Sequence, residues 1–185
     1  FRIFTENNPD PTENPLFAAT CLNANLVPNP GFEYFETCPD NFIPTPATPG
    51  QWISPNNHWK IPTMGSSDYF NDCAIFSAPI ESPHNSIFGI QNPRNGTAHG
   101  GFFAGGASTY REYVSTKLTS PMVIGKKYVL SMYVSRADYY PYTTNNIGFG
   151  LNKGDISVST YDTLLVDKVL LPTVNEVITE SENWV

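Results

Sequence analysis

Two turns that lie far apart in the sequence carry residues whose oxygen atoms could bind a cation. The segment Asn29-Pro-Gly-Phe-Glu33 places a carboxylate on a turn, and Asn95-Gly-Thr97 forms a second turn. Carboxylate, amide and backbone carbonyl oxygens are the ligands that Ca²⁺ prefers. The alternative is a turn in which Glu33 accepts hydrogen bonds from backbone amides. The candidate calcium ligands are Glu33, Asn29, Asn95 and Thr97.

Aromatic side chains among polar neighbours form a second candidate site. Rings beside Asn, Asp and Ser suit the faces and hydroxyl groups of a sugar, or a protein partner. The alternative is that several of these rings only cover the ends of the core. The candidate ligand-binding residues are Trp59, Tyr69, Tyr133, Tyr139, Tyr140 and Tyr142.

The sequence contains no recognisable catalytic motif. The three histidines lack the spacing of a zinc site, and no Gly-x-Ser-x-Gly elbow is present. A pair of carboxylates for glycoside hydrolysis is conceivable, but nothing in the sequence brings two of them together. We therefore predict no catalytic residue and a protein that is not an enzyme. The carboxylates considered are Glu33, Glu36, Asp68, Asp72, Glu81, Glu112 and Asp138.

Length and charge narrow the class of protein further. A chain of 185 residues is long enough for one core, and ten scattered Lys and Arg against a net charge of −7 disfavour nucleic acid as a partner. No run approaches the roughly 20 apolar residues of a membrane span. The first residues do not resemble a signal peptide. We expect an extracellular or cell-surface protein whose signal peptide is already absent.

Alternating side chains and frequent turns predict an all-β fold. Residues 128–134 alternate most clearly and should form a central antiparallel pair with residues 110–118. Residues 87–91 and 98–104 read as a hairpin, because the turn Asn92-Pro-Arg-Asn-Gly96 separates them. Further predicted strands are 147–151, 155–158 and 163–171, the proline-rich residues 1–24 are predicted as an extended arm outside the core, and residues 36–82 as a long loop.

The three cysteines are Cys21, Cys38 and Cys73. In a secreted protein, two of them should pair. A bridge from Cys38 to Cys73 would close a loop of about 35 residues and contribute roughly 3–4 kcal/mol by the chain-entropy model. Cys21 would then be a buried thiol or an intermolecular partner.

Several segments together resemble a known class of module. Asn25-Leu-Val-Pro-Asn-Pro-Gly-Phe-Glu33 resembles the opening of galactose-binding-like jelly rolls, which include carbohydrate-binding modules, and residues 118–134 resemble their central hairpin. A narrower resemblance is to surface proteins of gliding Bacteroidetes, which the type IX secretion system exports. The motifs that carry it are the turn before Cys38-Pro, Pro62-Thr-x-Gly-Ser-Ser-Asp-Tyr-Phe-Asn-x-Cys73, Gly89-x-Gln-x-Pro93, Tyr110-Arg-Glu-Tyr113 and Tyr133-Val-Ser-x-Ala-Asp138.

The resemblance implies a β-sandwich jelly roll over residues 25–185, a Cys38–Cys73 disulfide and a structural Ca²⁺. Glu33 would be a calcium ligand, and the turn Asn95-Gly-Thr97 would contribute carbonyls. A closing strand with a further Asp would lie beyond Val185. Asp162-Thr163-Leu164 resembles a bacterial O-glycosylation signal, with Thr163 as the modified residue.

These observations give three hypotheses of function. The first is a non-catalytic, extracellular carbohydrate-binding or adhesion module, with a glycan or another surface partner. The second is a structural subunit of a surface filament, in which the arm of residues 1–24 adds a strand to a neighbouring copy. The third is a glycoside hydrolase, which would require two carboxylates in one cleft.

Overall fold

The computed structural model describes residues 2–5, 25–54, 58–75, 81–82, 85–86, 88–104, 109–172 and 177–185. These residues form short strands and one 3₁₀ turn, with no α-helix among them, so the predicted all-β class is confirmed. No helix in these ranges has the length and hydropathy needed to cross a membrane. The elements are β1 (Arg2–Thr5), β2 (Asp68–Asn71), η2 (Asp72–Ile75), β3 (Glu81–Ser82), β4 (Asn85–Ser86), β5 (Ala98–Gly101), β6 (Tyr128–Ser131), β7 (Phe149–Leu151) and β8 (Lys168–Leu170).

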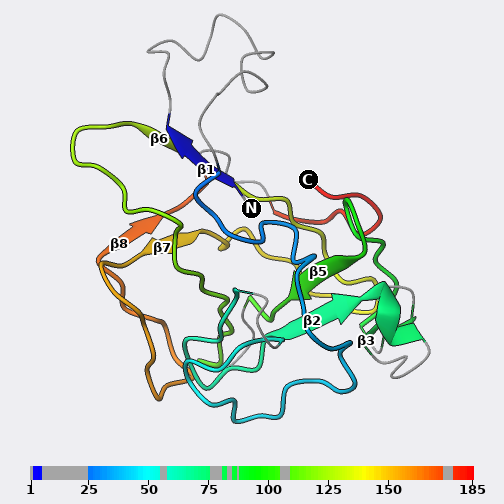
Figure 1. Ribbon diagram of the computed structural model, residues 1–185. Coiled ribbons are helices and arrows are strands. Elements are labelled where there is room, and N and C mark those ends of the chain that lie inside the picture. Colours follow the sequence, from blue (N-terminus) through cyan, green and yellow to red (C-terminus); the bar gives the residue numbers. More distant parts are fainter. Residues whose placement is uncertain are drawn as a thin grey trace, which may run out of the picture.

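The described strands pair into four antiparallel two-stranded sheets. The pairs are β1 with β6, β2 with β5, β3 with β4, and β7 with β8. Long irregular segments connect them, and β3 lies beside β2 and η2 (Figure 1). Much of the chain is therefore held by isolated hydrogen bonds between segments, since few backbone groups belong to ladders.

Strand β6 confirms the strand predicted at residues 128–134 but has a different partner. Tyr128 and Leu130 pack against the core, whereas Val129 is exposed, which is the expected alternation. The partner is β1, so the predicted pairing with residues 110–118 is wrong. Ser115 of that segment instead exchanges two backbone hydrogen bonds of 2.8 Å with Lys60.

The first strand belongs to the core. Of residues 1–24, predicted as an extended arm outside the core, the structure describes only β1, and there the chain is extended and paired with β6. Ile3 is 5% exposed and joins the core cluster. Its amide donates to the Asn25 side chain at 2.9 Å, and its carbonyl accepts from Leu26 at 2.8 Å. Cys21 lies outside the described residues.

The pairing of β2 with β5 replaces the hairpin predicted for residues 87–91 and 98–104. All four residues of β2 are buried, and β5 contributes Gly100 and Gly101 opposite them. A Cβ on Gly101 would lie 2.7 Å from the Phe70 ring, and one on Gly100 would lie 3.0 Å from the Phe32 ring. Glycine in β5 therefore makes room for aromatic side chains. The described part of residues 87–91 lies along residues 135–139 instead.

Two further strand predictions are confirmed in shortened form. β7 falls within residues 147–151 and β8 within residues 163–171, and they pair with each other. Residues 155–158 form no strand, although Val158 donates to the carbonyl of Pro62 at 2.8 Å. Figure 1 shows β7 and β8 apart from the β2–β5 pair.

The long loop predicted for residues 36–82 contains much of the core. Ile61 and Thr63 are fully buried, and β2 also lies in this segment. The predicted Cys38–Cys73 disulfide is confirmed, with the two Cα atoms 5.7 Å apart. The bridge fixes one end of this segment to η2.

Removing the disulfide should reduce stability strongly, because it closes a loop of 35 residues. A Cys38→Ser/Cys73→Ser variant should lose about 4 kcal/mol of unfolding free energy in the chain-entropy model. Urea titrations of this variant and of the reduced wild type should agree. Unfolding midpoints equal to that of the oxidised protein would show that other contacts already constrain the loop.

Candidate functional site

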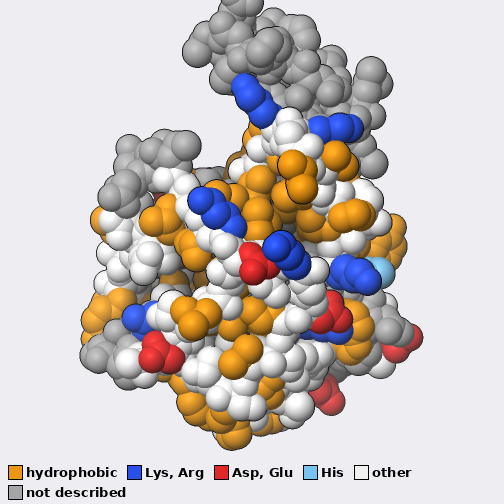
Figure 2. Space-filling model, turned by 90° about the vertical axis from the view of Figure 1, so that its left-hand side faces the viewer, with side chains coloured by type: hydrophobic (Ala, Val, Ile, Leu, Met, Phe, Trp, Pro, Cys, Tyr) orange, Lys and Arg blue, Asp and Glu red, His pale blue; other side chains and the backbone are white. Residues whose placement is uncertain are grey.

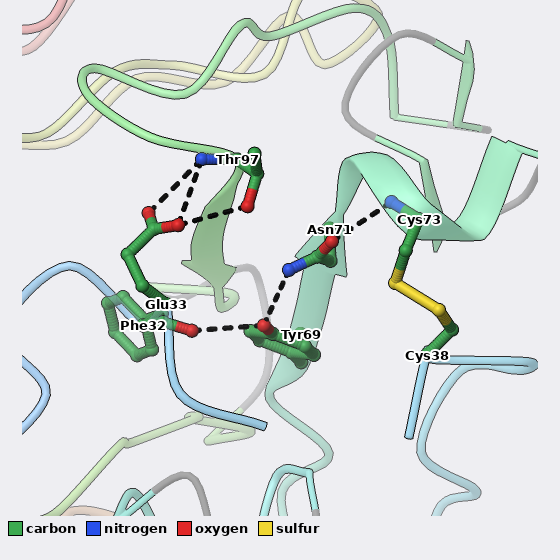
Figure 3. The surroundings of a disulfide bond; sticks show 7 residues. All are labelled: Phe32, Glu33, Cys38, Tyr69, Asn71, Cys73 and Thr97. Atoms are coloured by element: carbon green, nitrogen blue, oxygen red, sulfur yellow. Dashed lines mark hydrogen bonds between the residues drawn. A yellow bond between two sulfur atoms is a disulfide. The ribbon is translucent and has the colours of Figure 1, made fainter. Parts of the chain in front are cut away.

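The Glu33 carboxylate closes the turn that precedes β5. It accepts hydrogen bonds from the Thr97 amide at 3.0 and 3.2 Å and from the Thr97 hydroxyl at 2.9 Å (Figure 3). Gly96 has a φ of 72°, and a Cβ there would lie 2.2 Å from a Glu33 carboxylate oxygen. The turn therefore fits around the carboxylate only because residue 96 is glycine. The alternative in which Glu33 accepts from a backbone amide is thus the one observed.

The other candidate calcium ligands are also held by contacts within the protein. Asn29 is buried at a φ of 44°, and its amide both donates to and accepts from the backbone of Tyr34, each at 3.0 Å. In its hydrogen-bonding orientation, the Asn95 amide accepts from Arg94 Nη1 at 2.7 Å. Because the Thr97 amide and hydroxyl donate to Glu33, this carboxylate serves in the structure as a hydrogen-bond acceptor that links the two turns. Within the described ranges, no three His, Cys, Asp or Glu side chains form a metal-binding group.

Two of the predicted ligand-binding aromatics belong to the core. Trp59 is 3% exposed, stacks on Phe32 with ring centroids 4.9 Å apart, and donates to the Asn29 carbonyl at 2.9 Å. Tyr69 is 1% exposed, and its hydroxyl donates to the Phe32 carbonyl at 2.9 Å. Neither ring can contact a ligand at the surface, so the prediction is corrected for both. Their loop context indicated exposure, but tertiary packing buries them.

Three of the four remaining candidate aromatics line a cavity of about 1070 Å³. One wall is the β2–β5 pair, and the opposite wall is formed by residues of the segment 131–147. Tyr133, Tyr140 and Tyr142 line it, whereas Tyr139 does not. Tyr140 packs against Phe88 and Phe103, while Tyr142 is 78% exposed at its mouth. The structure thus brings together three of the six predicted residues.

Three segments that are distant in sequence form one wall of this cavity. The Phe88 carbonyl accepts from the Tyr139 amide at 3.0 Å, and the Gln91 side chain accepts from the Ser135 hydroxyl at 2.8 Å. Residues 88–91 therefore lie along residues 135–139. The third segment is residues 180–185, in which Val185 exchanges two 2.9 Å backbone hydrogen bonds with Val134.

Sequence reasoning missed two residues at this cavity. Trp184 lines it, donates to the Asn92 carbonyl at 2.7 Å, and meets His99 edge-on at 5.4 Å. Arg94 also lines it and lies over the Tyr133 ring, 3.5 Å from the centroid. Trp184 and Arg94 reach this cavity through the tertiary arrangement of segments that are distant in sequence. No local sequence motif indicates that they lie there.

Two buried carboxyl groups line the same cavity. Burial raises the pKa of Asp68 to about 7; a hydrogen bond at 2.8 Å from the Ile43 amide opposes this, and the nearby Glu112 charge adds to it. Burial also raises the pKa of Glu112, against hydrogen bonds from the Tyr110 hydroxyl and the Phe103 amide, each at 2.6 Å. Both groups were among the carboxylates considered for hydrolysis. The Ser66 hydroxyl also donates to Glu112 at 3.3 Å, so the described donors engage both carboxylate oxygens and this group connects three segments of the chain.

Of the remaining predicted positions, Thr163 and His58 lie outside the cavity lining, whereas His99 is part of it. Thr163 is exposed, as a modification site must be, and its amide donates to Asp162 at 2.6 Å. His58 is exposed and His99 stacks on Phe70, whereas His84 lies outside the described residues. On the face shown in Figure 2, Lys and Arg side chains are interspersed with hydrophobic and acidic ones.

Comparison of the chain with known proteins finds no matching protein-family model, no matching curated protein and no matching solved structure.

Replacing Glu33 tests its role in the turn. Glu33→Gln places an amide group opposite the Thr97 donors and should lower the unfolding free energy by about 1 kcal/mol. Asp40→Asn, also at an exposed acidic position, is the control and should change little. Thermal melts with added Ca²⁺ or with a chelator should coincide. A calcium-dependent rise in melting temperature that Glu33→Gln abolishes would restore the calcium hypothesis.

The raised pKa of Asp68 predicts a pH dependence of stability. Because the folded state holds this proton more tightly, its contribution is complete below the ordinary pKa of 3.8 and is lost as pH rises to about 7. Asp68→Asn keeps an acceptor for Ile43 and should remove a slope of at most about 1.4 kcal/mol per pH unit over that range. The measurement is the difference between the urea stabilities of the two proteins at pH 4–8. If the stabilities of the wild type and of Asp68→Asn change with pH in parallel, the raised pKa of Asp68 is contradicted.

Proposed function

We propose that the chain is a non-catalytic, extracellular carbohydrate-binding module and that the cavity beside β5 holds the glycan. The observation that carries this proposal is the joint presence of aromatic rings and polar side chains around one cavity. Its volume of about 1070 Å³ reaches the upper end of small-molecule sites, roughly 300–1,000 Å³, and suits several sugar rings.

The chemistry of the lining supports a sugar ligand. Sugars present apolar C–H faces, which pack on aromatic rings, and hydroxyl groups, which need hydrogen-bonding partners. Tyr142 and the partly buried Trp184 provide rings, and Asn146 and Arg94 provide polar groups. The Cys38–Cys73 disulfide supports an oxidising, extracellular compartment. The antiparallel all-β architecture is consistent with a jelly-roll module of a secreted surface protein, which we include in the proposal.

The pairing of β1 with β6 within one chain weighs against the filament hypothesis. β1 already pairs with β6 of its own chain, so strand addition to a neighbour through Arg2–Thr5 would require this pairing to open. Ile3 would also leave the core. The binding module requires no such rearrangement.

Hydrolysis is the second candidate, because Asp68 and Glu112 line the same cavity and burial raises both pKa values. A carboxyl that stays protonated near neutral pH is what a general acid requires. The hydrogen bonds that Glu112 accepts from the protein favour a structural role for it. Release of reducing ends from a bound oligosaccharide, abolished in Asp68→Asn, would establish hydrolysis and exclude a purely binding module.

Two exposed tyrosines offer a matched test of the binding proposal. Tyr142→Ala removes a ring that lines the cavity, and Tyr139→Ala removes one, 66% exposed, that does not. We expect Tyr142→Ala to weaken binding of glycans, identified on an array, by about tenfold, through loss of ring packing. Tyr139→Ala should bind like the wild type, by titration calorimetry. Equal losses in both variants, or an array without any bound glycan, would contradict the proposal.

A further inference from the structure

We propose that the ligand of this cavity is an acidic glycan and that Arg94 binds the carboxylate of a uronic acid residue, with Tyr133 as the surface that orients it. This inference rests on the proposed function, because it specifies the class of sugar in the same cavity. It concerns Arg94, which the sequence placed only in the turn of residues 92–96 and did not mark as a ligand-binding residue.

Contacts on two sides hold the Arg94 side chain in place. Its guanidinium carbon lies 3.5 Å from the centroid of the Tyr133 ring, a close cation–π contact. On another side, Nη1 donates to the Asn95 side-chain oxygen at 2.7 Å. Both Arg94 and Tyr133 line the cavity. A guanidinium group held in this way loses little conformational entropy when it binds a ligand.

The charge of Arg94 is not compensated locally. Among the described residues, no carboxylate forms an ion pair with it, although the chain carries a net charge of −7. Arg136 and Arg111, the other arginines of the lining, donate to backbone carbonyls of the wall, Arg136 to those of Thr179 and Tyr140 and Arg111 to that of Tyr110. Arg94 is exposed, and its guanidinium retains donors that can meet a ligand.

Two of the acidic side chains of the cavity ionise less readily than they would in solvent. Burial raises the pKa of Asp68 to about 7, so part of its negative charge is absent near neutral pH, and burial also raises the pKa of Glu112. A third, Asp138, accepts a hydrogen bond at 3.2 Å from the Ile90 amide. The exposed guanidinium of Arg94 is an attractive charge for an anion at this cavity.

The shape of the donor group selects the ligand. A planar guanidinium presents parallel N–H groups that match the two oxygens of a carboxylate. Tyr142, exposed at the same cavity, can pack against the sugar ring that bears this carboxylate. A uronic acid combines both features in one residue, whereas a neutral sugar uses only the ring.

Titration calorimetry of the whole chain with three probes tests this inference. The probes are a galacturonate tetrasaccharide, its methyl ester, and a sulfated oligosaccharide that contains no uronic acid. Wild type should bind the acid at least tenfold more tightly than the ester, with weaker binding at high salt. Arg94→Gln should reduce the ratio of acid to ester affinity to about one, and Arg94→Lys should keep only part of the preference. Lys126→Gln, a change of equal charge at an exposed position outside the cavity, is the control and should bind like the wild type.

The possible results separate this inference from the proposed function. Equal affinity for the acid and its ester in the wild type would overturn the acidic-glycan inference and leave glycan binding intact. Stronger Arg94-dependent binding of the sulfated probe than of galacturonate would also overturn it, since the recognised anion would be a sulfate. No binding of any probe or array glycan would overturn both. Unchanged melting temperatures of the Arg94 variants would show that the losses come from recognition and not from unfolding.

Discussion

The buried hydroxyl of Tyr69 joins the parts of the molecule that sheet pairing leaves separate. It donates to the Phe32 carbonyl at 2.9 Å and accepts from the Asn71 amide at 2.8 Å, and Asn71 in turn accepts from the Cys73 amide (Figure 3). Burial raises the pKa of Tyr69, so the hydroxyl keeps the proton that it donates. One side chain thus connects the first turn, β2 and the disulfide. Loss of the hydroxyl would leave a buried carbonyl without this donor, which typically costs about 1–3 kcal/mol.

Sequence patterns predicted features that depend on local burial and failed for features that depend on distant partners. The alternation in β6 was readable because one of its faces packs on the core. Its pairing with β1 was not, because about 120 residues separate the strands and no local signal specifies the partner. The contact of Glu33 with Thr97 was anticipated from two turns. Its chemistry was left open, because a carboxylate suits either a cation or amide donors, and only geometry distinguishes them.

The lack of a local signal for distant contacts also explains which predictions about aromatic residues succeeded and which failed. Tyr133, Tyr140 and Tyr142 do line the cavity, whereas Trp59 and Tyr69 are core residues within an irregular segment. In a sheet, position along a strand indicates which face is buried, but an irregular segment has no such period. Burial there is decided by packing against other segments. Exposure of an aromatic ring in a loop is therefore a weak inference from sequence, even in a chain whose fold class is clear.

The short sequence motifs contact one another and form the framework of the cavity. The Ser67 hydroxyl donates to the Tyr113 carbonyl at 2.9 Å, and a Cβ on Gly89 would lie 2.6 Å from that of Asp138. Glycine at position 89 allows this close approach and serine at position 67 supplies the hydrogen-bond donor, whatever the ligand. Arg94 and Tyr142 line the cavity but do not belong to the resemblance motifs. Under the proposed function, a chain with the same motifs but other residues at these two positions would keep the cavity and differ in its ligand.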